Sequence, residues 1–395
     1  MEGDRETVST IIFYIGFVTC PKKMIQDSNQ EAFFEFVRAG LFPSLCARIL
    51  VHGISVDWSD VYNLAEEQSV IGLVAAGIDT LPPSERPPQQ VVLQFVGSTL
   101  QLEKRNKAMN DFIASLIGDL RNADCYAVLV KGQGVAQCYE HPLWRASGDV
   151  DLLLSKENYE KAKEILTPRA ESIDEEDNGR LHLGMTIDGW IVELHGTLIT
   201  GISNRLNRVI DEVQSSIFFS GEVRSWLNKG TQVFLPSPNN DVFLVFSHIL
   251  EHFYVEGIGL RQICDWCRLL LTYREEIDVQ LLERRLRDAK ILTEWKGFAA
   301  LAVDFLGMPA EAMLLYDDAT KWRKKADKIR DLILKSGNFG RNKDKSYRAN
   351  SSKVKSLTIT FWRRVKEFAE LTTIFPSQTP RIFLTYVKSR IMANV

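Results

Sequence analysis

A chain of 395 residues is too long for one small hydrophobic core, so its length predicts two or three domains. Its composition, 45% hydrophobic and 25% charged residues, is that of a folded globular protein and excludes a disordered or fibrous one. The formal net charge of -3 favours no class of binding partner.

No apolar stretch approaches the ~18–20 residues that a membrane-spanning helix needs, so the sequence predicts no transmembrane segment. The apolar run 11–20 lies near the N-terminus, but three acidic residues and one arginine precede it, which is the wrong charge bias for a signal peptide. The six cysteines have no framework spacing. These features predict a cytoplasmic protein with reduced thiols.

The first part of the chain is predicted to be helical. Residues 1–28 form a poorly defined extension, within which Met24 is an alternative start. A helical N-terminal region, 29–122, follows. Its apolar spacing predicts one helix around 32–41, a second from Trp58 to Ala76, and a long third helix from Gln89 to about Asn122.

Residues 123–236 combine strand and helix patterns and are predicted to form the α+β catalytic domain. The expected strands are 125–131, 149–154, 180–187, 190–196 and 232–235. The expected helices are 135–140 and 156–166, with Ser155 as the cap of the second. Asp188-Gly189 predicts a tight hairpin between the third and fourth strands.

Residues 237–395 are predicted to form a helical C-terminal domain. Helical patterns fit a segment that starts at Asn240 or Asp241 and runs through Phe253, and the segments 259–274, 278–290, 293–306, 319–335 and 357–374. Cys264 and Cys267 form a lone C-x-x-C without the second pair that a structural zinc site would need, so we expect both thiols in a helical core.

Asp149 and Asp151 are two carboxylates on one face of an expected strand, since alternate strand residues share a face. Their mutual repulsion favours a site where a cation lies between them. If the strand 190–196 pairs beside 149–154, Glu193 completes a three-carboxylate site. Such a site suits two divalent ions that clamp the oxygens of a phosphoryl displacement.

A glycine-rich turn precedes these acids: Lys131, Gly132, Gln133 and Gly134. Backbone N–H groups at such a turn form an anion site, and the lysine adds positive charge. Arg145, four residues before the first aspartate, is expected to reach a triphosphate oxygen.

In this order the motifs resemble the polymerase-β-type nucleotidyltransferase superfamily, and most closely its uncharacterised bacterial branch, nucleotidyltransferase family 5. The resemblance covers roughly residues 29–270 and rests on Lys131-Gly132-x-Gly134, Tyr139, Arg145, Gly148 to Leu153, and Val192 to His195. It implies an α+β fold, with a small mixed-sheet core flanked by N-terminal and C-terminal helical regions. It also implies that Asp149, Asp151 and Glu193 bind Mg²⁺ and that the glycine turn holds a triphosphate. Gln133 replaces the serine that is commoner in this turn.

These expectations predict an Mg²⁺-dependent nucleotidyltransferase that uses two metal ions. It would move a nucleoside monophosphate from a nucleoside triphosphate to an acceptor hydroxyl, on a small molecule, a sugar or a protein. Across the cleft, His195, Arg261 and Asp265 are expected to face substrate. The alternatives are a buried His195 and a surface Arg261–Asp265 ion pair at helical spacing.

Three other interpretations stay open. The segment 321–355 carries thirteen lysines and arginines against three aspartates, which favours either RNA binding by an RNA-end nucleotidyltransferase or a solvated face. His248 and His252 match an inverted zinc-protease motif, H-x-x-E-H, or simply line a cleft or core. A catalytically silent nucleotide-binding or interaction module is the last alternative.

Overall fold

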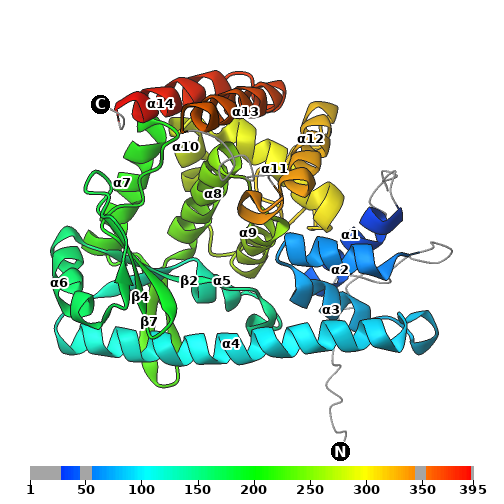
Figure 1. The fold of residues 1–395 in the computed structure, drawn as a ribbon, viewed down its shortest axis with the longest axis horizontal. Helices are drawn as coiled ribbons and strands as arrows, with labels where there is room; N and C mark the ends of the chain where they lie inside the picture. The colour runs from blue at the N-terminus through cyan, green and yellow to red at the C-terminus, as the bar shows by residue number, and fades with distance from the viewer. Residues whose placement is uncertain (1–27, 45–55, 343–352, 393–395) are drawn as a thin grey trace, which may run out of the picture.

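A computed structural model describes residues 28–44, 56–342 and 353–392, in which helices surround one seven-stranded mixed sheet (Figure 1). The strands are β1 (Ala127–Val130), β2 (Asp149–Leu154), β3 (Ser172–Ile173), β4 (His182–Ile187), β5 (Trp190–His195), β6 (Val223–Asn228) and β7 (Thr231–Pro236). Their order is β3-β4-β5-β2-β1-β7-β6. The β2–β5 and β1–β7 pairs are parallel and the others antiparallel, which confirms the expected α+β class with a mixed sheet.

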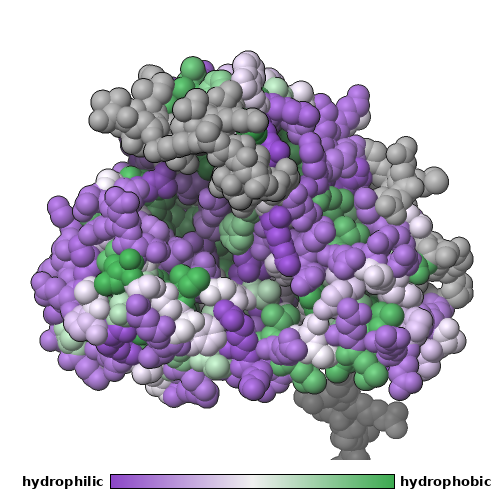
Figure 2. Space-filling model, viewed as in Figure 1, coloured by the Kyte–Doolittle hydropathy of each residue, from purple (hydrophilic) through white to green (hydrophobic). Residues whose placement is uncertain are grey.

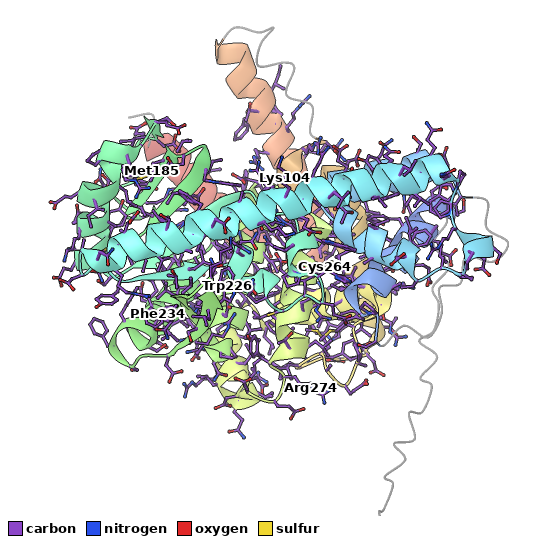
Figure 3. The ribbon with its side chains drawn as sticks, turned by 90° about the horizontal axis from the view of Figure 1, so that it is seen from below. Lys104, Met185, Trp226, Phe234, Cys264 and Arg274 are labelled. Carbon is purple, nitrogen blue, oxygen red and sulfur yellow. The ribbon has the colours of Figure 1, made fainter. Side chains whose placement is uncertain are left out.

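Four helices precede the sheet: α1 (Ser28–Leu41), α2 (Trp58–Glu67), α3 (Ile71–Asp79) and α4 (Gln89–Asn122). The single helix predicted from Trp58 to Ala76 is wrong. The chain leaves the helical path after α2, and Ser69 takes a left-handed φ of 57° before α3 begins. Helix α4 has the predicted bounds, and it crosses nearly the whole molecule (Figure 3).

Three helices lie within the sheet region: α5 (Gly132–Ala136), α6 (Lys156–Leu166) and α7 (Asn204–Phe219). The C-terminal helices are α8 (Pro238–Val255), α9 (Leu260–Thr272), α10 (Val279–Asp288), α11 (Leu292–Leu306), α12 (Thr320–Ser336), α13 (Lys353–Ile374) and α14 (Thr379–Met392). Short 3₁₀ turns occur at Pro83–Glu85, Pro142–Trp144, Thr167–Arg169 and Asn338–Gly340. The sequence patterns did not predict α7, β6 or α14.

Two local predictions in the sheet region are confirmed. The Ser155 hydroxyl accepts a hydrogen bond from the Asn158 backbone N–H at 3.2 Å and so caps α6. Asp188 and Gly189 both have positive φ, 51° and 73°, as a two-residue hairpin turn of the primed type requires. This turn fixes the register of β4 on β5.

The two faces of the sheet belong to different hydrophobic clusters. Val150, Leu152 and Leu154 pack with the C-terminal half of α4 and with α6. Leu153, on the opposite face of β2, belongs to a larger cluster that includes residues of α1, α8, α9 and α11. The N-terminal and C-terminal helical regions therefore share one core, and the face of β2 that carries Asp149 and Asp151 is turned toward it.

Within the described residues, no helix is long and apolar enough to cross a membrane. Cys264 and Cys267 are buried free thiols in α9, which confirms the expectation of core cysteines. In space-filling form the face seen in Figure 1 is mainly hydrophilic, and it is hollowed near the upper end of the sheet (Figure 2).

Glu294 is a carboxyl buried in the helical core, 1% exposed, on α11. The Tyr254 hydroxyl donates to its Oε1 at 3.0 Å, and its Oε2 has no hydrogen-bond partner among the described residues. Burial raises the pKa of this carboxyl from an ordinary 4.5 to about 7. The folded protein therefore holds this proton more tightly than the unfolded chain does.

We predict that Glu294 makes the protein less stable as the pH rises from 4.5 to about 7, because over this range the unfolded chain releases the Glu294 proton while the folded protein still holds it. Relative to wild type, Glu294→Gln should gain up to roughly 3 kcal/mol in the free energy of unfolding over this range, since each pKa unit is worth about 1.4 kcal/mol. Urea unfolding at pH 5 and pH 8 measures this. Glu311→Gln, at an exposed glutamate, is the control; equal pH dependence in all three proteins would contradict the prediction.

Candidate active site

Three carboxylates converge on one face of the sheet. In the parallel β2–β5 pair, Asp151 lies directly opposite Glu193, so the strand pairing on which the three-carboxylate expectation depended is present. Asp149 lies two residues before Asp151 on the same strand face. Carboxylate oxygens of the three residues all lie within 4.8 Å of one another, close enough to share a metal ion.

Lys131 places a positive charge in this cluster. Its Nζ lies 2.8 Å from Asp151 Oδ1. Burial opposes ionisation of Asp151, but Lys131 and His195 outweigh it and hold the pKa of Asp151 below its usual value. Burial, together with the adjacent Asp151 carboxylate, raises the pKa of Asp149. Lys131 alone therefore does not neutralise Asp149 and Asp151, and further positive charge would stabilise the cluster.

Two histidines border the cluster. His195 Nε2 lies 3.0 Å from Asp151 Oδ1 and 3.4 Å from Glu193 Oε2. His182 Nε2, from β4, lies 3.4 Å from the same Glu193 oxygen. Contacts with His182 and then His195 lower the pKa of the Glu193 carboxyl. His195 thus lies at the carboxylates, as expected, with its side chain only 11% exposed.

His182 is a residue of the site that the sequence analysis missed. It pairs with His195 across the β4–β5 hairpin. A two-residue turn at Asp188-Gly189 makes Ile187 the partner of Trp190, and counting outward from it leads to the His182–His195 pair. The register of the predicted hairpin could therefore have identified His182 as a neighbour of His195.

The glycine turn has a strained backbone. Lys131 and Gly132 both have left-handed φ, 58° and 45°. Gly134 serves packing, because a β-carbon there would come within 2.7 Å of Leu235 Cδ2. The Gln133 side chain is buried, and its Nε2 donates to Asn106 Oδ1 at 2.8 Å. This amide therefore anchors the turn to α4.

Arg145 and Asp265 form a buried ion pair between the chain segment before β2 and helix α9. Arg145 Nε and Nη2 donate to the two Asp265 oxygens at 3.0 and 2.6 Å, and Nη1 donates to the Ser147 hydroxyl at 2.6 Å. The Tyr139 hydroxyl donates to Asp265 Oδ1 at 2.7 Å. The Arg145 guanidinium is thus held by protein groups, and its expected contact with a triphosphate stays a prediction.

Arg261, which was expected to face substrate or to pair with Asp265, instead donates from Nη1 to the Ala146 carbonyl at 3.0 Å. In the described part of the chain, Asp265 takes its ion pair from Arg145. Burial lowers the pKa of Arg261, and the Asp149 carboxylate acts in the opposite direction. Arg261 is therefore within electrostatic range of both Asp265 and Asp149, while Asp265 is buried on α9.

The zinc-protease alternative gains no support. The rings of His248 and His252 lie 4.3 Å apart, but among the described residues neither histidine belongs to a group with metal-binding geometry. Glu251 Oε1 instead accepts from Arg180 Nη1 at 3.1 Å and from the Gly201 N–H at 3.2 Å. These residues link α8 to the segments that follow β3 and β5.

Some lysines of the basic segment 321–355 form contacts within the protein. Lys335 pairs with Glu370 at 3.0 Å, and Lys325 donates to the Ile374 carbonyl. Trp322 is buried, and Tyr347 lies outside the described residues. RNA binding through this segment stays a prediction.

We predict that Asp265→Asn destabilises the protein by about 3–5 kcal/mol, because it leaves the buried Arg145 guanidinium without its counter-ion. Guanidinium chloride unfolding measures the loss. The control is Asp119→Asn, which removes a half-exposed partner of Arg169 and should cost less than about 1 kcal/mol. Similar losses in both variants would show that the buried pair has no special weight.

No curated protein and no solved structure matches the chain. One family model does match: that of a family described as an uncharacterised nucleotidyltransferase, over residues 55–307, well over half of the chain. The matched region contains the glycine turn, the three carboxylates and the Arg145–Asp265 ion pair. The chain therefore belongs to this nucleotidyltransferase family.

Proposed function

We propose that the protein transfers a nucleoside monophosphate from a nucleoside triphosphate to an acceptor hydroxyl and releases pyrophosphate. The observation that carries this proposal is the convergence of Asp149, Asp151 and Glu193 on adjacent strands, with oxygens within 4.8 Å of one another. Membership of a nucleotidyltransferase family supports the reaction class.

The donor set fits magnesium. Three carboxylates offer hard oxygen ligands, and Mg²⁺ prefers one or two of these together with substrate phosphates. The raised pKa of Asp149, caused by burial and by Asp151, marks a cluster that another cation would stabilise. Two Mg²⁺ ions held by Asp149, Asp151 and Glu193 would supply charge neutralisation at the reacting phosphate and its leaving group.

Lys131 is suited to meet the triphosphate. Its ammonium already lies in the cluster, 2.8 Å from Asp151, on a flexible side chain that can turn toward a phosphate oxygen. Its backbone begins the strained turn that Gln133 ties to α4. The turn thus presents a fixed main chain and one adjustable charge to the phosphates.

The acceptor would lose its proton near Glu193 and His195. The acceptor oxygen attacks the α-phosphorus, the bond from that phosphorus to the bridging oxygen breaks, and pyrophosphate leaves with the electron pair. The proton passes to a base of the site. Asp151 and Glu193 lie directly opposite each other on β2 and β5, so either carboxylate is placed to take this proton.

We predict that Asp149→Asn lowers the rate of pyrophosphate release by roughly a hundredfold or more, because it removes a carboxylate from a metal site whose charge stabilisation is worth several kcal/mol. The assay incubates each α-labelled triphosphate with Mg²⁺ and a fractionated lysate and follows label transfer and pyrophosphate together. Asp188→Asn, the same change at the exposed hairpin, is the matched control and should keep the wild-type rate.

The same assay tests the alternatives. If wild type and Asp149→Asn bind Mg-ATP alike and no fraction becomes labelled, the protein is a silent nucleotide-binding or interaction module and the proposal is wrong. If label enters RNA, and RNA binding weakens steeply with salt, the acceptor is an RNA end rather than a small molecule, sugar or protein.

A further inference from the structure

His182, Glu193 and His195 form a second group with metal-binding geometry, beside the three carboxylates and sharing Glu193 with them. The group follows from strand register: His182 pairs with His195 across the hairpin, and β-strand alternation puts His195 on the same face as Glu193. No residue of this group comes from a loop. All three side chains therefore start from fixed backbone positions.

The distances from the two histidines to Glu193 suit a shared ion better than hydrogen bonds, although His195 Nε2 also lies 3.0 Å from Asp151 Oδ1, a hydrogen bond that a bound ion would replace. Both histidine Nε2 atoms lie 3.4 Å from Glu193 Oε2, beyond the roughly 2.7–3.2 Å of a good N–H···O bond. Ligand atoms bound at about 2.1 Å to one ion lie roughly 3.0–3.4 Å apart in octahedral or tetrahedral geometry. The ring centroids are 4.8 Å apart and the ring planes are tilted by 35°, so both rings approach the same carboxylate oxygen without stacking face to face.

The donor types separate this group from the carboxylates next to it. Two imidazole nitrogens and one carboxylate suit first-row transition ions, whereas sites made of carboxylate, carbonyl and water oxygens suit magnesium. The Asp149–Asp151 side of the cluster offers only oxygen ligands. The two groups therefore favour different cations. Glu193 belongs to both groups, and His195 adjoins Asp151 as well.

We propose that His182, Glu193 and His195 bind a first-row transition ion, Mn²⁺ or Zn²⁺, next to the Asp149–Asp151 oxygen site. The proposal rests on the proposed function only in that the two sites share Glu193; the nitrogen ligands define the ion independently of any transfer reaction. The active site is then a mixed centre, with an oxygen-bound ion at the aspartates and a nitrogen-bound ion at the hairpin. The histidines decide which metal occupies the second position.

The test uses the full chain and Mn²⁺ as the probe. Pulsed electron paramagnetic resonance detects coupling between bound Mn²⁺ and ¹⁴N, which imidazole ligands produce and carboxylate ligands do not. We expect this coupling in wild type and in Asp149→Asn. We expect His182→Ala to weaken Mn²⁺ binding at least tenfold and to reduce the coupling, and the double variant His182→Ala/His195→Ala to abolish it.

His141→Ala is the matched control, since His141 is exposed, stacks on Trp144 and belongs to neither group of described residues with metal-binding geometry; it should leave Mn²⁺ binding unchanged. Circular dichroism confirms that each variant is folded, and His182→Asn replaces His182→Ala if the alanine variant is not.

Three results would overturn the proposal: bound Mn²⁺ without nitrogen coupling, unchanged affinity in a folded His182 variant, or no Mn²⁺ binding by wild type. Nitrogen coupling without any nucleotidyl transfer would overturn the proposed function and leave the metal site standing; transfer without nitrogen coupling would do the reverse.

Discussion

The parallel pairing of β2 with β5 is the constraint on which the site depends. It forces Asp151 and Glu193, two like charges, into directly opposite positions on neighbouring strands. Two like charges in directly opposite positions destabilise a sheet unless positive charge lies close by. Lys131 and His195 supply part of that charge at 2.8 and 3.0 Å from Asp151. The rest of the site is arranged around this repulsion, and a bound cation would relieve it further.

A buried polar network holds the glycine turn and the start of β2 against the surrounding helices. Gln133 reaches both Asn106 on α4 and the Ser147 hydroxyl, which also accepts from Arg145. Arg145 in turn is clamped by Asp265 on α9. Gln133 therefore has a structural partner on each side. An amide buried in the core therefore fixes the position of the turn.

The sequence predicted what depends on local pattern. The bounds of β2 and α4, the Ser155 cap and the Asp188-Gly189 hairpin all follow from short-range periodicity and turn chemistry. The break at Ser69 was missed because serine is not a residue type that predicts a left-handed turn. The Arg145–Asp265 pair was missed because its members are 120 residues apart, and only tertiary packing brings them together. Arg261, four residues from Asp265 on the same helix, was the partner that local spacing favoured.

One face of β2 contributes to stability, and the other carries the residues of the candidate site. Val150, Leu152 and Leu154 bury one face of β2 in an apolar cluster with α4 and α6. On the other face, only Leu153 joins the hydrophobic core, since Asp149 and Asp151 take the alternate positions. A strand with two carboxylates on one face can remain in the middle of a sheet because its opposite face supplies the apolar burial. Changes to the carboxylates should therefore act mainly on binding and reaction, while changes to the face packed on α4 act on folding.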